Sequence, residues 1–522
     1  MGKRNTISSP AGYLFLTKYY SLKVIENWHT SSIGATDRHE KTINELEGTV
    51  HEQYSRKRNP GDSPYDHLEF ALKYDGVNLS ILTETFQRLD ENELCEFIKA
   101  KPTSQSRRRL WFLYEWYTKK RLPLDDLSSQ SYIPVLNPED YFTLSRPIRV
   151  SRQKVIDNLL GESNFCPIVR RTELLNQAQG VNQEQNIKEL LEAYDPQIRY
   201  RAMTYLYLKE TKSSFQIERE PENQNRQSRF VALLGNAENK DFCNKESLIE
   251  LQGLTVDPRF AAADYRTISN YVGSVGFSDA EKIFYIPPKP EDLPRLMVGL
   301  IRAHRRMLRG ETVPLIHAAA IAWGFVYLHP FIDGNGRVHR FLIHNVFAQR
   351  KYTPQGFIFP VSAAMLKNRA LYDQSLDAFS VPLMALLDYS FEGNNNIAVE
   401  NESEYLYRYI DFTRQAEILA QFVENTIQVE LVAELNFLSY YERTKRALQE
   451  VVDLPDQKLD LFMRSLDQNN GKLGEKKRRQ NFEFLTDEEI QEMENVFAQN
   501  WKVIPEPKRK LPAAETFDEG TL

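Results

Sequence analysis

The sequence contains only three cysteines in 522 residues, Cys95, Cys166 and Cys243. They are odd in number and lie far apart along the chain. A disulfide framework and a cysteine-based zinc site are therefore not expected. Such sparse use of cysteine is typical of the reducing cytoplasm, so we expect a cytoplasmic protein.

Long hydrophobic stretches are also missing. The longest nearly apolar run, residues 313–328, is interrupted by His317 and is too short to span a bilayer. The first ten residues carry positive charge, but no apolar stretch follows them, so they do not make a secretory signal. We expect no membrane segment and no membrane partner.

Neither sign of charge dominates, because 66 Lys and Arg face 72 Asp and Glu, for a net charge of −6. General nucleic-acid binders usually have a strong basic excess, so nucleic acid is not an expected partner. A local basic run, Lys472 with residues 476–479, keeps a DNA-binding regulator open as an alternative. Most such runs are solvated helix faces.

The hydrophobic pattern predicts a mainly α fold, and the length predicts two to four domains. Helices are expected over residues 13–29, 65–82, 107–120, 184–212 and 293–308. The run 313–328 is apolar nearly all round, which predicts a central buried helix. The polar stretch 218–228 predicts a loop.

Two segments are the best strand candidates, residues 268–275 and 283–286. Both are rich in β-branched and aromatic residues, and Gly276, Ser278 and Asp279 lie between them. These residues predict a β-hairpin. Prolines follow it at once, which ends the second strand.

The sharpest feature follows the central helix, where residues 329–340 read His-Pro-Phe-Ile-Asp-Gly-Asn-Gly-Arg-Val-His-Arg. A residue before proline avoids the helical region, so His329 closes the helix. A glycine loop that leads into a helix N-terminus is an anion cradle, because free N–H groups and the helix dipole point at the ligand. Arg337 and Arg340 share a helix face, and Asp333 is suited to the magnesium ion that accompanies nucleotide phosphates.

This run resembles the signature of the Fic family, His-Pro-Phe-x-Asp/Glu-Gly-Asn-Gly-Arg-x-x-Arg, and every fixed position is met. The resemblance implies a helical Fic core over residues 205–390 with a target-docking flap at about 268–286. Helical regions would flank it at 1–204 and 391–503, and a disordered tail would follow at 504–522. The implied enzyme is a protein adenylyltransferase, which moves AMP from ATP to a Tyr, Thr or Ser hydroxyl.

The resemblance also assigns roles to single residues. His329 would be the general base and Asp333 would bind Mg²⁺. Gly334, Asn335 and Gly336 would form the anion hole, Arg337 would contact the phosphates and Arg340 the γ-phosphate. The related Doc-like kinases carry Lys at the position of Gly336, so transfer of AMP is favoured over transfer of the γ-phosphate. The expected partners are ATP and a protein target, while self-modification and homo-oligomerisation stay open.

Many members of the family hold themselves inactive with a helix that bears Ser/Thr-x-x-x-Glu-Gly/Asn. Residues 211–219 resemble that segment, with Ser214 and Glu218 at the required spacing. Glu218 would pair with Arg340 and block the γ-phosphate. Arg219 departs from the pattern, because Gly or Asn is expected there, and this puts the strength of the inhibition in question.

Two further readings stay open. The same site would support removal of AMP from a modified protein, with Glu218 orienting water. Tyr372 is suited either to a place near the adenine or to the core. The remaining histidines near the signature, among them His304, His317 and His339, are expected to be structural, since no carboxylate or cysteine joins them at a ligand spacing.

Overall fold

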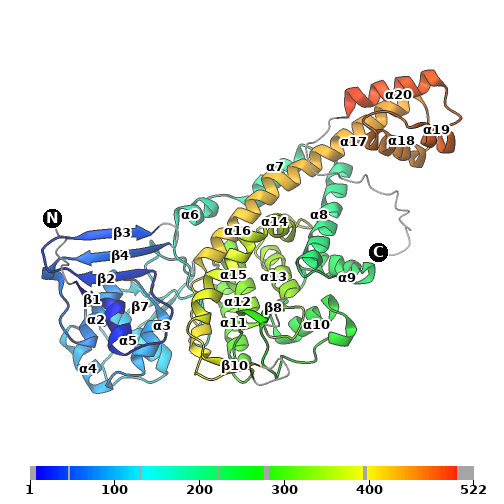
Figure 1. The fold of residues 1–522 in the computed structure, drawn as a ribbon. Helices are drawn as coiled ribbons and strands as arrows, with labels where there is room; N and C mark the ends of the chain where they lie inside the picture. Colours follow the sequence, from blue (N-terminus) through cyan, green and yellow to red (C-terminus); the bar gives the residue numbers. More distant parts are fainter. Residues whose placement is uncertain are drawn as a thin grey trace, which may run out of the picture. The chain divides into compact units, whose positions relative to one another are not determined.

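The computed structural model describes residues 8–44, 48–128, 131–220, 223–275, 281–391 and 397–501. It is mainly helical with small sheets, as the sequence predicts (Figure 1). As far as residues are described, the first of two compact units spans Met1–Asn182, Thr211–Gln355 and Val361–Phe422. The second spans Gln183–Glu210, Gly356–Pro360 and Val423–Leu522. The domain boundaries expected from the sequence stay predictions.

The N-terminal part of the first unit contains two small sheets besides its helices. One sheet has the order β1 (Ser9–Ala11), β2 (His29–Ile33), β4 (Thr49–Tyr54) and β3 (Glu40–Asn44), with β2 and β4 parallel and the other pairs antiparallel. The other sheet has the order β5 (Ile133–Pro134), β7 (Val155–Asp157) and β6 (Ile148–Val150). The helices of this part are α1 (Gly12–Tyr19), α2 (Pro64–Tyr74), α3 (Leu79–Phe86), α4 (Glu91–Ala100) and α5 (Gln105–Thr118).

Several sequence expectations for this part need correction. The helix expected over 13–29 ends at Tyr19, and Ser21 adopts a left-handed conformation. The segment 65–82 forms two helices, because Gly76 has φ 84° and breaks it. The helix expected over 107–120, in contrast, is present as α5. Its aromatic residues pack inward, and Arg108 donates to the carbonyls of Gln153 and Ser131, so this helix belongs to the core.

The central helices follow the sequence prediction closely. They are α11 (Leu293–Arg309), α12 (Pro314–Leu328) and α13 (Asn335–Gln349). The apolar helix α12 packs against both α11 and α13 (Figure 1), because it offers a hydrophobic surface on every side. It is also the helix that leads directly into the His329 loop.

The remaining elements of the first unit surround these three helices. They are α6 (Glu173–Gln179), α9 (Gln224–Gly235), α10 (Lys245–Thr255), α14 (Val361–Lys367), α15 (Arg369–Met384) and most of α16 (Thr413–Asn425), with β10 (Tyr389–Phe391) and β11 (Ile397–Val399). The loop expected over 218–228 is wrong in its second half, since α9 begins at Gln224. The Asn223 side chain caps it by accepting from Arg226 N.

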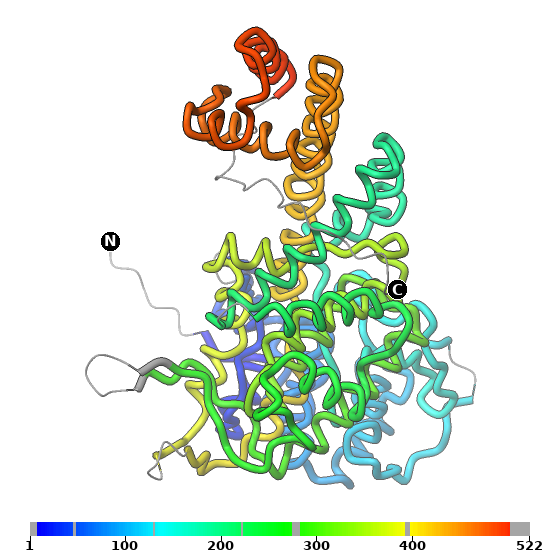
Figure 2. Tube along the Cα trace, turned by 90° about the vertical axis from the view of Figure 1, so that its right-hand side faces the viewer, coloured from blue at the N-terminus to red at the C-terminus, as the bar shows by residue number. Residues whose placement is uncertain are grey.

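The predicted hairpin is present as β8 (Val272–Val275) and β9 (Glu281–Tyr285). The two strands pair antiparallel and run side by side in Figure 2. Its turn, residues 276–280, lies outside the described residues. At its base, Tyr285 donates a hydrogen bond to the carbonyl of Tyr327, which joins the hairpin to the end of α12.

The second unit is helical. It contains α7 (Gln183–Glu192), the first part of α8 (Pro196–Ile217), α17 (Val432–Val451), α18 (Asp456–Gln468), α19 (Glu475–Asn481) and α20 (Asp487–Asn500). The helices α17, α18 and α20, with Phe482 and Leu485 after α19, share one hydrophobic core. These helices are the orange and red segments of Figure 2. The tail expected at 504–522 lies outside the described residues, and among the described residues no helix is both long and apolar enough to cross a membrane.

The N-terminal part and the central helices of the first unit meet at Phe165. Its ring is fully buried, and it fits because Gly299 of α11 and Gly324 of α12 face it. A Cβ atom at Gly299 would approach the Phe165 Cβ to 2.8 Å, and one at Gly324 would approach its Cζ to 2.9 Å. The two glycines therefore admit one aromatic ring against α11 and against α12, the helix that leads into the His329 loop.

We expect Phe165→Ala to lower the free energy of unfolding by about 3–5 kcal/mol, because it opens a cavity between two packed helices. Urea unfolding followed by tryptophan fluorescence measures this loss. Phe260→Ala, at a side chain that is 60% exposed, is the matched control and should change it by less than about 0.5 kcal/mol. Equal losses in both variants would contradict the proposed packing role.

Candidate active site

The loop that follows α12 is fixed by its own residues. His329 ends the helix with φ 49°, and Gly334 has φ 87°, a conformation that glycine adopts without strain. The Asn335 side chain accepts from Phe331 N at 3.0 Å and donates to Phe331 O at 2.7 Å. Asn335 therefore closes the loop with its side chain, and only its backbone N–H is left to serve an anion.

The start of α13 points free N–H groups out of the loop. The first backbone bond of the helix runs from Val338 N to Gly334 O at 3.0 Å. The N–H groups of residues 335–337 come before it and have no acceptor within the helix. Together with the positive end of the helix dipole they are suited to bind an anion. That they bind phosphate stays a prediction.

His329 is held as a neutral base. Its Nδ1 lies 3.2 Å from the carbonyl of Val326, which can only accept, so Nδ1 carries the proton and Nε2 keeps its lone pair. Removal from water lowers the pKa of His329 to about 4, and the positive charge of Arg266 acts in the same direction. The negative charges of Glu218 and Asp333 oppose this shift.

Arg266 is a site residue that the sequence did not reveal. Its side chain is buried and donates to the carbonyls of His329 and Ile268, and its backbone N–H donates to Pro330 O. It therefore ties the base of the hairpin to the His329 loop. Nothing near Arg266 in the sequence marks it, because all its partners are backbone carbonyls.

The two arginines of the signature are both buried. Arg337 is 1% exposed and donates to the carbonyl of Thr255 at 2.8 Å and to Asp333 Oδ1 at 3.1 Å. Arg340 is fully buried and donates from Nε to Ser214 Oγ at 2.9 Å. Guanidinium groups so far from water need carboxylate partners, since an unpaired buried charge is costly.

The structure brings Ser214, Glu218 and Arg340 together, in the contact that the family resemblance implies; its inhibitory role stays a prediction. Arg340 Nη2 donates to Glu218 Oε1 at 2.8 Å and to Ser214 O at 2.8 Å. Burial opposes the ionisation of Glu218, but the charge and hydrogen bond of Arg340 outweigh it and hold the pKa of Glu218 below its ordinary value. The carboxylate is therefore charged at neutral pH.

Gly336 makes room for this contact. A Cβ atom at position 336 would stand 2.2 Å from Glu218 Oε1, so any side chain there would expel the carboxylate. Gly336, which stands where Doc-like kinases carry Lys, is therefore also needed for the Glu218–Arg340 pair to form.

The backbone conformation at Arg219 shows why Gly or Asn is expected at this position. It follows α8 with φ 56°, the left-handed conformation in which helices usually place Gly or Asn. Its N–H donates to Gln216 O, and the N–H of Glu220 donates to Phe215 O, which completes a helix C-cap. The position needs a backbone conformation rather than a side chain, and arginine adopts it at a cost of about 1–2 kcal/mol.

Tyr372 lies in the core and also touches the site. It is buried, hydrogen-bonds to Arg340 and lies parallel to the ring of His339, with ring centroids 6.2 Å apart. Nothing here places it against a nucleobase. The buried pair His304 and His317 is bonded to itself at 3.0 Å, away from the signature arginines.

The donor set fits a magnesium ion that arrives with phosphate. Among the described residues, no three His, Cys, Asp or Glu side chains gather at a metal site. Asp333 offers a half-exposed carboxylate beside the cradle; it is 45% exposed and uses Oδ1 for its contacts with Gly334 N and Arg337. Magnesium is commonly held by one or two carboxylates with substrate phosphates and water, so a single Asp suffices.

The basic run near the C-terminus is largely paired. Lys472 contacts Glu494 at 2.7 Å, Arg479 lies 3.7 Å from Glu475, and Arg478 contacts Asp487. This surface of the second unit carries mixed charge, which gives the DNA-binding alternative no added support.

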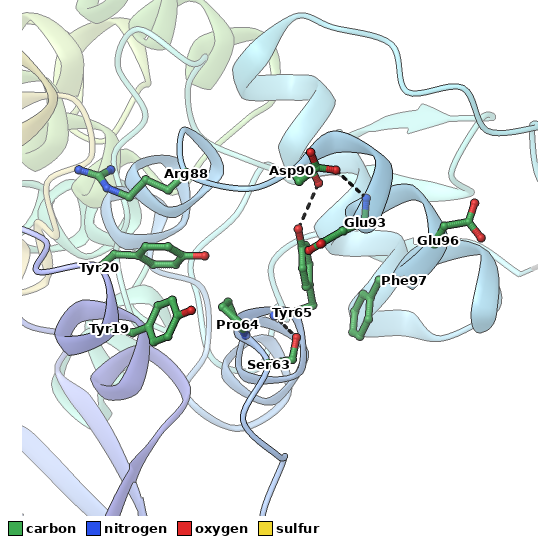
Figure 3. Close-up of a pocket in the computed structure, with 10 residues that line it drawn as sticks. All are labelled: Tyr19, Tyr20, Ser63, Pro64, Tyr65, Arg88, Asp90, Glu93, Glu96 and Phe97. Carbon is green, nitrogen blue, oxygen red and sulfur yellow. Dashed lines mark hydrogen bonds between the residues drawn. The ribbon is translucent and has the colours of Figure 1, made fainter.

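A separate cavity of about 520 Å³ lies in the N-terminal part of the first unit (Figure 3). It is lined by aromatic and acidic side chains from α1, α2 and α4 and their flanks, among them Tyr20, Tyr65 and Glu93. Tyr65 donates to the carbonyl of Asp90 across it. None of its lining residues belongs to the His329 loop or to α13.

We expect an NMR titration to give His329 a pKa of about 4 instead of the ordinary value of about 6.5. In Glu218→Gln the pKa should fall further, because the lost negative charge had favoured the imidazolium form. The chemical shifts of the neutral ring should report the proton on Nδ1. A pKa near 6.5 in both proteins would show that the imidazole is in water.

The comparisons with known proteins agree with this geometry over part of the chain. Residues 242–347 match the Fic/DOC family. The chain is 34% identical over 103 residues to the protein adenylyltransferase Fic of Drosophila erecta, covering 19% of this chain and 18% of that protein. It is 32% identical over 120 residues to the Culex quinquefasciatus protein of the same name, covering 22% and 21%. The match thus spans about a fifth of the length of these relatives.

Two solved structures are also similar to the chain. A Fic family protein from Desulfovibrio desulfuricans matches 63% of this chain and 88% of its own, at 15% identity and a TM-score of 0.37. A Fic domain containing signaling protein from Bacteroides thetaiotaomicron matches 49% and 95%, at 16% identity and a TM-score of 0.34. Residues 242–347, which include the whole His329–Arg340 run, match the Fic/DOC family, and part of the chain has distant similarity to protein adenylyltransferases.

Proposed function

We propose that this protein is a protein adenylyltransferase, which transfers AMP from ATP to a Tyr, Thr or Ser hydroxyl of a protein and releases pyrophosphate. One observation carries the proposal: a neutral histidine base directly precedes a helix N-terminus that holds two buried arginines. The partial similarity to proteins named protein adenylyltransferase supports the same reaction class.

The phosphates of ATP fit the start of α13. The N–H groups of residues 335–337 would bind their oxygens, and Arg337 and Arg340 would supply compensating charge. Because these donors are fixed before the ligand arrives, they stabilise the charge that develops in phosphoryl transfer without reorganising. Mg²⁺, held by Asp333 and the phosphates, would neutralise further negative charge.

His329 would take the proton from the target hydroxyl. Nε2 is its free acceptor, since Nδ1 donates to Val326 O. The hydroxyl oxygen then attacks the α-phosphorus, the bond from the α-phosphorus to the bridging oxygen breaks, and pyrophosphate leaves in line. The proton stays on Nε2 until it passes to solvent.

Glu218 would keep this site inactive at rest. Its carboxylate occupies Arg340, which is the guanidinium suited to the terminal phosphate, and Gly336 leaves the space for it. ATP would have to displace the carboxylate before it could bind in the reactive orientation. Autoinhibition therefore belongs to the proposal.

We expect weak protein labelling by the wild type with Mg²⁺ and ATP labelled at the α-phosphate. Labelling should be strong in Glu218→Gly, where Arg340 is free. In Glu218→Gly with His329→Ala it should fall by roughly 10²–10⁴-fold, the usual contribution of a general base. Gel autoradiography after incubation with a cell extract measures all three.

ATP labelled at the γ-phosphate is the control that shows which group of ATP is transferred. Label that enters protein from the γ-position and not from the α-position would sink the adenylyltransferase and indicate phosphate transfer. Absence of protein labelling from either position in Glu218→Gly would also contradict the proposal.

We expect Arg219→Gly to strengthen the inhibition and to lower wild-type labelling by two- to fivefold. Glycine removes the left-handed strain, and its own entropy cost cancels only part of that gain. Arg219→Ala is the matched control, because it removes the side chain but keeps the strain, and its labelling should match the wild type. Higher labelling in Arg219→Gly would show that the arginine side chain itself supports inhibition.

A further inference from the structure

A second carboxylate reaches the signature arginines. Glu220 Oε1 lies 2.5 Å from Arg337 Nη1, and its side chain is 20% exposed. It is two residues beyond Glu218 and lies outside the Ser-x-x-x-Glu pattern that Ser214 and Glu218 fulfil. Besides the contact of Arg337 with Asp333, the site therefore contains two ion pairs to residues at the end of α8, Glu218 with Arg340 and Glu220 with Arg337.

The backbone at Arg219 explains how neighbouring carboxylates reach different arginines. Glu218 closes the last turn of α8, with its N–H bonded to Phe215 O. The left-handed residue then reverses the chain, so Glu220 leaves in a new direction. Arg337 and Arg340 are three residues apart on α13, so they sit on one face about one turn apart.

Glu220 is also held from its other side. Its Oε2 lies 2.6 Å from Arg226 Nη1 in the first turn of α9. The Phe215 ring packs under both guanidinium groups, 5.5 Å from that of Arg337 and 5.9 Å from that of Arg226. A carboxylate fixed between two arginines over one buried ring is a built contact rather than a passing surface pair.

We propose that Glu220 is a second autoinhibitory residue, which occupies Arg337 while Glu218 occupies Arg340. The inference rests on the proposed nucleotide-binding function of the site. Arg337 is the arginine closer in sequence and along α13 to the His329 loop and Asp333, so it faces the phosphates next to the reacting one. Arg340 lies a turn further along and faces the terminal phosphate. Glu218 thus excludes the γ-phosphate, and Glu220 weakens the binding of the inner phosphates as well.

This division predicts a difference between ADP and ATP. Releasing Arg340 helps only a nucleotide that has a γ-phosphate, whereas releasing Arg337 helps both nucleotides. If Glu220 instead holds the Arg337 side chain in the orientation that binds phosphate, loss of Glu220 should weaken the binding of both nucleotides.

The test measures the affinities of MgADP and MgATP by calorimetry in the full chain with His329→Ala, so that no transfer occurs. We expect added Glu220→Gln to tighten the binding of both nucleotides by about 5–10-fold, within the usual range of coupling between sites. Added Glu218→Gly should tighten MgATP clearly more than MgADP. Glu238→Gln removes the same charge at an exposed position and should change neither affinity.

Weaker or unchanged MgADP binding in Glu220→Gln, with the melting temperature of the parent, overturns the inference. If Glu220→Gln does not fold, Arg226→Gln is measured in its place. This change leaves Arg337 as the only arginine bound to Glu220, so MgADP should bind no tighter than in the parent. Tighter MgADP binding in Arg226→Gln overturns the inference. Nucleotide binding without α-label transfer in the His329-containing proteins removes the proposed function alone. No binding by any variant overturns both.

Discussion

The burial of two guanidinium groups at one helix N-terminus is the constraint on which the site depends. Arg337 and Arg340 are almost fully removed from water. The positive end of α13 adds to their charge, so this place requires an anion in every state of the protein. In the structure Glu218 and Glu220 supply it, and a polyphosphate carries the same sign of charge. Under the proposed function, the inhibitory carboxylates and the substrate phosphates would therefore compete for the same two arginines.

The parts predicted correctly from the sequence are those that local chemistry decides. The apolar run 313–328 has no polar face, so it is buried among the other helices. The proline after His329 ends this helix. Gly334 and Asn335 close the next turn by their own conformation and hydrogen bonds. The Glu218–Arg340 contact spans many residues, yet it was predictable because a family resemblance supplied the pairing.

The parts that the sequence did not reveal depend on distant partners. Strand β2 is polar, and its side chains are satisfied far along the chain, where Asp75 accepts from Ser31 Oγ and contacts His29. No alternation marks such a strand, so the N-terminal sheets were not expected. Arg266 binds only backbone carbonyls, and α9 starts within a polar stretch that resembles a loop. Glu220 was not predicted as a site residue, because its contact with Arg337 depends on the backbone reversal at Arg219.

That reversal links the strength of inhibition to a single backbone angle. A glycine at position 219 would reach the left-handed region freely, whereas arginine enters it against strain. If this strain is relieved when the segment opens, it lowers the free energy needed to release both carboxylates together. Two ion pairs make the resting site tight, and one strained residue between them makes it easier to open. Under the proposed function, a chain with both features would be firmly closed without ATP and would still respond to ATP.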